Sequence, residues 1–470
     1  MIKLSIMKRN IKWLILIAVV IAVSILLALS VGEYVDSDAE SISDFLSSED
    51  ITILVLLCGG ILFLLAILLL VLLLVRPDKH KVTLKLEGEQ ELTAVGVGGG
   101  SEVGSTVEDE GRERFCMLSE IENKKESYRR GGYDENVTLE GFCESLRNYA
   151  ASNLRLYYDI SDIRRFIAGM AVSHIIILQG MSGTGKTSLA HAFGSFIDNS
   201  STIIPVQPMW KERTDLVGYY NEFTKKFNET LLLEKMYEAN YSEDMYITVL
   251  DEMNIARVEY YFAEFLSLLE LPNPEERYID VVSDRWETDP GQLKDGRIKL
   301  PANMWFIGTA NNDDSTFAIS DKVYDRAMIL NLDAKSDRFI APRTEKVRIS
   351  AKQFERLVKE ATEEYEISAR NKKRLELLDE YLITHFHITF GNRIMKQINT
   401  YIPVYISCGG EELDALDDIL AKKVIRKLET QNPIYLRNAA EGLVSYMNEL
   451  FGQDKMTLCK EYIRRLERNA

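Results

Sequence analysis

The string Gly180-Met-Ser-Gly-Thr-Gly-Lys-Thr187 has a composition and spacing that suit the binding of a polyphosphate. Its glycines allow successive backbone N–H groups to converge on a phosphate at the start of a helix. The lysine can offset charge on the β and γ phosphates, and the last threonine hydroxyl can ligate Mg²⁺. The sequence therefore predicts a site for a magnesium nucleotide, with contacts from Gly180, Ser182, Gly183, Thr184, Gly185, Lys186, Thr187 and Ser188.

Two adjacent carboxylates, Asp251 and Glu252, follow the apolar run at 246–250. If this run is a strand beside the phosphate loop, Asp251 can hold Mg²⁺ together with Thr187. Glu252 can then polarise the water that attacks the γ-phosphate. The alternative is an acidic pair that caps the helix after the strand. Because the same chain carries a phosphate loop, we expect the catalytic arrangement.

Five short apolar runs, separated by segments with helical spacing, must position these residues. The runs lie at 174–178, 203–206, 246–250, 304–308 and 327–332. Apolar strands that alternate with helices are typical of a parallel sheet with helices on both faces. Beyond about residue 350 the apolar spacing is helical throughout. We therefore expect an α/β fold with a five-stranded parallel sheet, followed by an all-α lid domain.

Two segments near the N-terminus, 13–31 and 51–75, contain no charged side chain. As a helix, each is long enough to cross a hydrocarbon core of about 30 Å. Basic residues flank the pair, whereas the connecting segment at 32–50 carries only acidic charges. By the positive-inside rule, this pattern predicts a transmembrane hairpin, a multi-pass membrane localisation, and a cytoplasmic position for both termini and the remaining chain. A cleaved signal peptide is the alternative for the first segment.

These patterns divide the chain into successive regions. We expect a basic cytoplasmic N-terminus (1–12), a membrane helix (13–31), an acidic extracytoplasmic loop (32–50), a second membrane helix (51–75), a flexible linker (76–135), an α/β nucleotide-binding domain (136–345) and a helical lid domain (346–470). The linker is expected to be flexible because glycines cluster at 96–104 and charged residues crowd the segment after them.

The overall composition narrows the classes of partner. The 470 residues carry a formal net charge of −16, from 56 Lys and Arg against 72 Asp and Glu. This excess of acid argues against the phosphate backbone of a nucleic acid as the main partner. The five cysteines show no CxxC or Cys/His spacing, so neither a zinc site nor a disulfide framework is indicated.

Three strings after the phosphate loop carry a family resemblance. They are Asp251-Glu-Met-Asn-Ile-Ala-Arg-Val-Glu-Tyr-Tyr-Phe262, Gly308-Thr-Ala-Asn-Asn-Asp313 and Asp321-Lys-Val-Tyr-Asp-Arg326. In this order they resemble the AAA+ ATPases of the dynein-related, MoxR and McrB group, over about residues 140–470. The resemblance implies a homo-oligomeric ring, usually a hexamer, with ATP and Mg²⁺ bound between neighbouring subunits; GTP is the alternative nucleotide.

The resemblance also implies roles for side chains outside the phosphate loop. Asn311 matches the sensor-1 position, where a polar side chain helps to position the attacking water, and Asn312 is the neighbouring candidate. Arg326 matches the arginine finger, which would reach the γ-phosphate of the next subunit; a surface ion pair is its alternative role. Arg393, in Phe390-Gly-Asn-Arg-Ile394, resembles sensor 2 and would lie over the phosphates of its own subunit.

Two further stretches fit the same group. Residues 210–227 resemble the insertion that interrupts its second helix, and 277–300 resemble the hairpin before sensor 1. The implied function is a membrane-anchored AAA+ ATPase that hydrolyses ATP to remodel an unknown protein partner at the cytoplasmic membrane face. The alternative is a McrB-like motor that hydrolyses GTP and acts on DNA with a partner nuclease. The acidic composition favours the first function.

Overall fold

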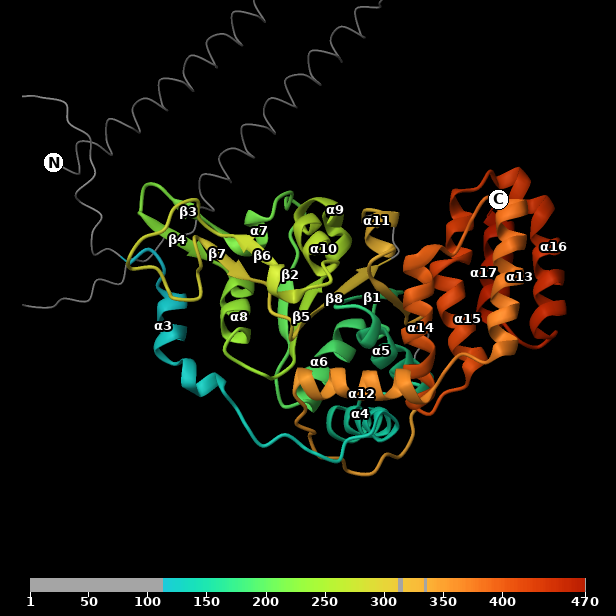
Figure 1. The fold of residues 1–470 in the computed structure, drawn as a ribbon, viewed down its shortest axis with the longest axis horizontal. Helices are drawn as coiled ribbons and strands as arrows, with labels where there is room; N and C mark the ends of the chain where they lie inside the picture. Colours follow the sequence, from blue (N-terminus) through green and yellow to red (C-terminus); the bar gives the residue numbers. More distant parts are fainter. Residues whose placement is uncertain (1–112, 312–315, 334–335, 470) are drawn as a thin grey trace, which may run out of the picture. The chain divides into compact units, whose positions relative to one another are not determined.

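The structure is a computed structural model that describes residues 113–311, 316–333 and 336–469. Helices and strands carry the labels of Figure 1. Asn312, the two segments predicted to cross a membrane and the glycine-rich stretch at 96–104 lie outside the described residues.

A parallel sheet of five strands, in the order β2-β5-β8-β1-β9, forms the centre of the α/β domain (Figure 1). The strands are β1 (Ile175–Gly180), β2 (Thr202–Pro205), β5 (Tyr246–Asp251), β8 (Met304–Asn311) and β9 (Met328–Asn331). Between β1 and β8 the register runs from Ile175 opposite Phe306 to Gly180 opposite Asn311. The five predicted strands and the predicted α/β fold are therefore confirmed.

Helices cover both faces of the sheet. In β1, Ile176 and Leu178 are buried on one face, whereas Ile175 and Ile177 are buried on the other. This double burial explains why the run is apolar throughout, because no side chain of the strand's first four residues faces solvent. The first face is covered by α4 (Leu139–Leu154), α5 (Ile160–Val172) and α6 (Lys186–Phe196), and the second by α8 (Leu231–Ala239), α9 (Val258–Tyr261) and α10 (Ala263–Leu269).

Two antiparallel hairpins interrupt the alternation of strands and helices. β3 (Gly218–Asn221) pairs with β4 (Lys226–Glu229), and β6 (Tyr278–Asp280) pairs with β7 (Arg297–Lys299). The first hairpin falls in the stretch predicted to be an insertion, and the second confirms the hairpin predicted at 277–300. Short elements complete the domain: α7 (Thr214–Val217), η2 (Met253–Ile255), η3 (Pro274–Glu276) and α11 (Asp321–Tyr324).

The end of the predicted linker is folded, which corrects the expectation of a flexible segment up to residue 135. α3 (Met117–Asn123) and η1 (Lys125–Tyr128) follow Phe115, which is fully buried in the same apolar cluster as α8. Arg114 is 2% exposed, and its Nη2 atom lies 2.6 Å from Asp289 Oδ2 in the loop between β6 and β7. The sequence does not reveal this folded segment, because charged residues surround its three buried apolar residues. These three residues become buried only against a surface that distant parts of the chain form.

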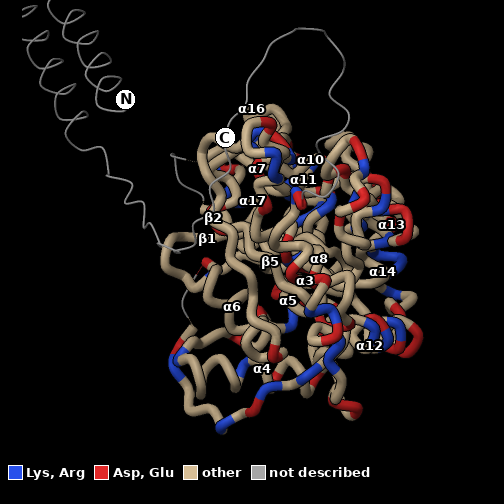
Figure 2. The backbone as a smooth tube through the Cα atoms, turned by 90° about the vertical axis from the view of Figure 1, so that its left-hand side faces the viewer, with Lys and Arg blue, Asp and Glu red and all other residues tan. Residues whose placement is uncertain are grey.

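The C-terminal region is all-helical, as predicted. It contains α12 (Ala351–Glu364), α13 (Ala369–Phe386), α14 (Gly391–Ser407), α15 (Glu412–Lys423), η4 (Ile425–Thr430), α16 (Pro433–Phe451) and α17 (Thr457–Asn469). Ser350 and Gln353 form a capping box that begins α12. Acidic and basic residues are interspersed along α12 and α13 (Figure 2), which fits helices with a solvated face.

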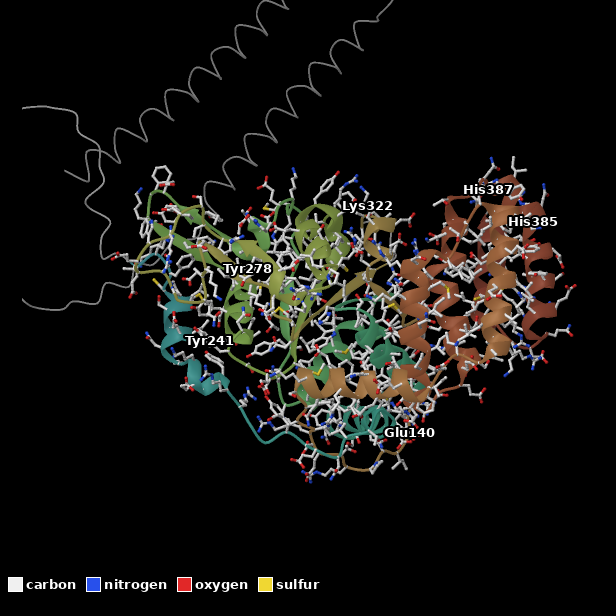
Figure 3. The ribbon with its side chains drawn as sticks, in the orientation of Figure 1. Glu140, Tyr241, Tyr278, Lys322, His385 and His387 are labelled. Atoms are coloured by element: carbon white, nitrogen blue, oxygen red, sulfur yellow. The ribbon has the colours of Figure 1, made fainter. Side chains whose placement is uncertain are left out.

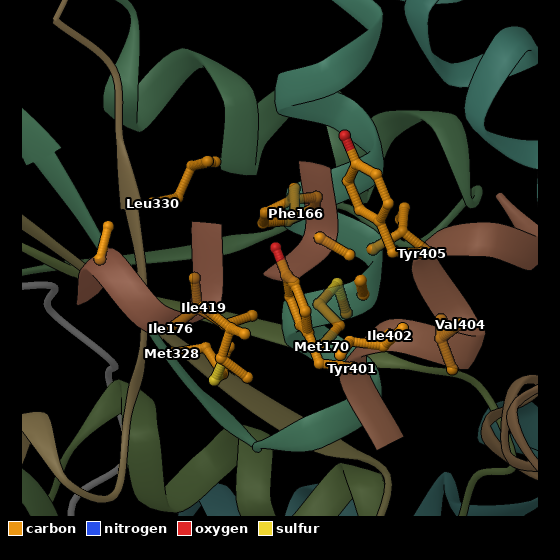
Figure 4. Close-up of a cluster of buried hydrophobic side chains, with 14 of the residues drawn as sticks. Phe166, Met170, Ile176, Met328, Leu330, Tyr401, Ile402, Val404, Tyr405 and Ile419 are labelled. Atoms are coloured by element: carbon orange, nitrogen blue, oxygen red, sulfur yellow. The ribbon is translucent and has the colours of Figure 1, made fainter. Parts of the chain in front are cut away.

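Apolar side chains join this lid domain to the sheet. Tyr401 and Ile402 of α14 belong to the same buried cluster as Phe166 of α5 and Met328 of β9 (Figure 4). Tyr401 also donates a hydrogen bond of 2.6 Å to Asp418 of α15, which satisfies its buried hydroxyl. The lid is therefore packed against α5 and the β9 edge of the sheet.

The predicted multi-pass membrane localisation requires a correction. Within 113–469, wherever the structure describes the chain, no helix combines the length and the apolar character needed to cross a bilayer. The two segments on which the prediction rested lie outside these residues.

Replacement of Phe115 by alanine tests whether the segment before α3 belongs to the folded domain. The change should lower the free energy of unfolding by about 3–5 kcal/mol, because it leaves a cavity under a fully buried ring. Denaturant unfolding of the full chain, followed by tryptophan fluorescence, measures this loss. The exposed neighbour provides the control, since Met117→Ala should change stability by less than about 0.5 kcal/mol. Equal, small effects of both substitutions would show that the segment is not packed.

Candidate functional site

The phosphate loop connects β1 to α6, as the sequence predicts. Gly183 and Gly185 have φ values of +79° and +94°, which are left-handed conformations that glycine adopts without steric cost. Gly185 is also the N-cap of α6, so the loop ends where free backbone N–H groups begin. The hydroxyl of Tyr158 donates a hydrogen bond of 3.0 Å to Gly185 O and anchors the loop against the segment before α5. This geometry suits an anion at the helix N-terminus.

Lys186 is folded into this loop. Its amine donates hydrogen bonds to the carbonyl oxygens of Gly180, at 2.9 Å, and Met181, at 2.7 Å. The side chain belongs to the first turn of α6 and only 7% of the residue is exposed. The ammonium group of Lys186 is thus held within the loop, close to the backbone N–H groups that would surround a phosphate.

Asp251 and Thr187, the predicted magnesium ligands, are in direct contact. Thr187 Oγ1 donates a hydrogen bond of 2.8 Å to Asp251 Oδ1. Thr309 of β8 donates a second hydrogen bond of 2.8 Å to the same oxygen. A carboxylate and a hydroxyl at this spacing fit Mg²⁺, which prefers oxygen ligands and takes its other positions from water and phosphate.

The role of Thr309 was missed by sequence reasoning. It is 3% exposed, and its hydroxyl also accepts a hydrogen bond of 2.9 Å from the backbone N–H of Glu252. The sequence signal that could have indicated this role is the position of Thr309, a polar residue just after the apolar run at 304–308. The register of the two strands reveals the role of Thr309. It pairs Leu250 with Gly308, and so places Asp251 beside Thr309.

Glu252 lies immediately after β5, at the carboxyl edge of the sheet. Its φ of 53° is unusual for a residue other than glycine. Such conformations cost on the order of 1–3 kcal/mol and persist where surrounding contacts enforce them. Here the hydrogen bond to Thr309 enforces it. The exposed side chain therefore leaves the strand beside Asp251, where a base for the attacking water is predicted.

Asn311 ends β8 at the same edge, next to Gly180 across the strand pair. Its carbonyl oxygen accepts hydrogen bonds from Asn254 Nδ2, at 2.9 Å, and from Thr316 Oγ1, at 3.0 Å. Asn254 is 4% exposed, and it also donates to Phe317 O at 3.3 Å. Asn254 thus ties the segment after Asp251-Glu252 to both ends of the loop after β8, and it holds the backbone of the predicted sensor in place.

A groove of about 520 Å³ opens along this carboxyl edge towards the lid. Gln179, Asn311 and Asn331 line it from the ends of the strands. From the lid, its lining cations are Lys422, Arg426 and Arg465. The sequence did not indicate these three residues, because nothing in a helical stretch shows which face will meet the sheet.

Arg326 and Arg393 lie at the opposite end of the strands. Arg326 precedes β9, and its carbonyl oxygen accepts a hydrogen bond of 2.8 Å from Ser173, just before β1. Both guanidinium groups contact Glu270: Arg326 Nε lies 2.9 Å from one carboxylate oxygen, and Arg393 Nη2 lies 2.8 Å from the other. These residues line a second groove of about 510 Å³ with Ser173 and Ile175.

This placement corrects the expected role of Arg393. The phosphate loop follows the last residue of β1, whereas Arg393 lies beside the first. At about 3.3 Å per residue, the two ends of β1 are on the order of 20 Å apart. Arg393 therefore does not lie over the phosphates of its own subunit; it shares a carboxylate with Arg326 instead. The alternative role of Arg326 was a surface ion pair; in the structure its guanidinium pairs with Glu270.

One comparison, with profiles of known protein families, agrees with this geometry. Residues 175–327 match the sequence profile of the AAA domain, dynein-related subfamily. No curated protein matches the chain. Among solved structures, a presumed ATPase from Cytophaga hutchinsonii is similar at 15% identity and a TM-score of 0.43, over 70% of this chain and 98% of that one. A full-length MCM homologue from Methanopyrus kandleri is similar at 12% identity and a TM-score of 0.36, over 63% of each chain.

The matched residues contain the phosphate loop, the Thr187–Asp251 pair, Glu252, Asn311 and Arg326. Together, the geometry of the loop and the profile match show that the chain carries an AAA domain of the dynein-related subfamily and is an ATP-hydrolysing P-loop NTPase.

Proposed function

We propose that this ATPase works as a homo-oligomeric ring, most simply a hexamer, in which each active site is completed by the neighbouring subunit. The observation that carries the proposal is the position of Arg326, on the order of 20 Å from the phosphate loop of its own subunit. A guanidinium at that distance cannot touch its own nucleotide. In a ring, the groove that holds it would face the phosphates bound by the next subunit.

The shared carboxylate gives this groove a net positive charge. One Glu270 side chain neutralises one of two guanidinium groups, Arg326 and Arg393. The side chains of the two arginines are 26% and 51% exposed. A γ-phosphate from a neighbour could therefore displace Glu270 from one arginine without leaving that carboxylate unpaired. Both arginines would then stabilise charge on the transferring phosphoryl group.

Within one subunit, the remaining groups would bind the nucleotide and activate water. Backbone N–H groups of the loop and the amine of Lys186 would hold the β and γ phosphates. Thr187 and Asp251 would hold Mg²⁺, which supplies positive charge to the same oxygens. Glu252 would accept a proton from the attacking water, with Asn311 orienting that water. We infer a preference for ATP over GTP, because ATP is the usual substrate of this fold.

We propose a protein as the substrate of remodelling. Phe223, between β3 and β4, is fully exposed, and Tyr219 of β3 is 52% exposed. Lys225 is on the same turn. Exposed aromatic side chains on a short hairpin suit contact with an unfolded or extended protein segment. The net charge of −16 opposes a role in which the main contact is with DNA phosphates.

Glu252→Gln tests the assignment of the base. The amide has the same shape but cannot accept a proton, so turnover of ATP should fall by about 10²–10⁴-fold. Binding of a fluorescent ATP analogue should persist, because no phosphate contact is removed. Steady-state hydrolysis and binding by the full chain measure the two effects. Glu243→Gln is the control, since the Glu243 side chain is 55% exposed and pairs only with Lys352 among the described residues. Normal turnover by the Glu252 variant would refute its assignment.

Mixed subunits test the shared active site. Arg326→Ala should lower turnover by about 10³-fold or more, as loss of a finger does. Lys186→Ala should abolish nucleotide binding. When the two variants are mixed, an intact loop can meet an intact finger, so part of the activity should return. Arg356→Ala is the control substitution, because it removes an exposed arginine from α12. It takes the place of Arg326→Ala, and this variant alone should hydrolyse ATP normally. Failure of the inactive pair to complement would contradict the shared site.

The dependence of the hydrolysis rate on the nucleotide and on DNA distinguishes the proposed ATPase from the McrB-like DNA motor. ATP should be hydrolysed faster than GTP, and duplex DNA should not stimulate turnover. A preference for GTP, together with stimulation by DNA that falls steeply with salt, would favour the motor instead. Steady-state hydrolysis with each nucleotide, at two salt concentrations, distinguishes the two functions.

A further inference from the structure

The short segment that carries Arg326 is held by the lid. Lys423, the last residue of α15, is 2% exposed. Its amine donates hydrogen bonds to the carbonyl oxygens of Tyr324, at 2.7 Å, and of Ala327. These two carbonyls flank Asp325 and Arg326 in the chain. One lid side chain thus fixes both ends of the turn from which the finger extends.

Lys423 is an unusual residue to bury. Among the residues that the structure describes, no carboxylate lies within ion-pair distance of its amine, and burial lowers the pKa of this amine to about 7. Burial of an ammonium group is costly unless hydrogen bonds replace its water. The carbonyl of Tyr324 is a suitable partner, because it ends α11, where carbonyls have no acceptor role within the helix and carry partial negative charge. These hydrogen bonds therefore explain why the amine of Lys423 is buried between the lid and the segment at 324–327.

Other lid side chains hold the same segment. Arg426 of η4 lies with Nη1 2.8 Å from Asp321 Oδ1, and its guanidinium stacks at 4.2 Å over the ring of Tyr324. Gln397 of α14 donates a hydrogen bond of 3.2 Å to Asp325 O. α11, identified in Figure 3 by Lys322, is thus bound along its length by α14, α15 and η4. From the α/β domain, Ser173 bonds the carbonyl of Arg326 itself.

The residues that hold α11 also reach the nucleotide edge. Lys422, the neighbour of Lys423, and Arg426 line the groove that contains Asn311 and Gln179. Gln179, in turn, donates a hydrogen bond to the hydroxyl of Tyr324. The end of α15 and the start of η4 therefore face the nucleotide edge of their own subunit on one side and the finger segment on the other.

We propose that Lys423 is a positioning residue that fixes Arg326, so that the lid of one subunit sets the finger used by the active site of the next. This inference rests on the proposed shared active site and adds to it a route of communication between subunits. Lys423 touches neither nucleotide nor the reacting atoms. It acts on turnover only through the position of Arg326.

Lys423→Met removes the donor group while it preserves the length and apolar character of the stem. In the full chain, the maximal rate of ATP turnover should fall on the order of tenfold to a hundredfold, because small misplacements of a catalytic group have effects of this size. Binding of a fluorescent ATP analogue should not change. Lys359→Met is the control, since the side chain of Lys359 on α12 is 76% exposed and, within the part of the chain that the structure describes, forms an ion pair only with Glu363, at 3.7 Å.

Complementation distinguishes positioning from general damage. Lys423→Met subunits have an intact phosphate loop, so Lys186→Ala subunits, which retain an intact finger, should restore part of the turnover. Arg326→Ala subunits should not restore it, because neither partner then supplies a positioned finger. Normal turnover by Lys423→Met, or rescue by Arg326→Ala in place of Lys186→Ala, would overturn the proposal.

A second substitution covers the case in which Lys423→Met fails to fold. Gln397→Leu removes a separate lid contact with the finger segment and should show a smaller loss with the same pattern of complementation. If Gln397→Leu is fully active while Lys423→Met is unfolded, the lid does not position the finger and the inference is wrong. Failure of Lys186→Ala and Arg326→Ala to complement each other would instead refute the shared active site itself.

Discussion

The parallel pairing of β8 with β1 on one side and β5 on the other sets the geometry of the nucleotide site. This register places Gly180 beside Asn311, and it brings Thr309 of β8 to the carboxylate of Asp251 at the end of β5. Because apolar side chains bury both faces of these strands, a shift in register would expose them to water. The contacts among Thr187, Asp251 and Thr309 thus depend on hydrophobic burial elsewhere in the sheet.

The two ends of the same strands carry different functional groups. The carboxyl end collects the groups that we propose bind phosphate and activate water, whereas the amino end collects Arg326, Arg393 and Glu270. A parallel sheet makes this division unavoidable, because all its strands run in one direction and present their ends at opposite edges. In the proposed ring, an arginine finger at the amino edge would serve another subunit, because the direction of the strands places it far from the phosphate loop of its own subunit.

The lid links these two edges. Its apolar core is continuous with that of α5 and β9, and its polar residues Lys423, Arg426 and Gln397 bind the segment between the edges. Closely packed interiors transmit displacements, since they cannot deform without loss of contacts. A movement of the lid caused at the nucleotide edge would therefore reach α11 and Arg326 directly.

Local patterns in the sequence were sufficient to predict the five strands and the helical lid, and to place the phosphate loop, Asp251, Glu252 and Asn311 at the ends of those strands, because each depends on residues close together in the chain. Glycine spacing determines the shape of a loop, and an apolar run determines a buried strand. The packed segment around Phe115, the contact of Thr309 with Asp251, the pairing of Arg393 with Glu270 and the grip of Lys423 on α11 were decided only by the tertiary structure. These contacts join residues from distant parts of the chain, and a helical or strand pattern does not specify which distant surface a side chain will meet. Charged residues were the hardest to place, because the same arginine or lysine can be solvated, paired or buried according to the helix packed against it.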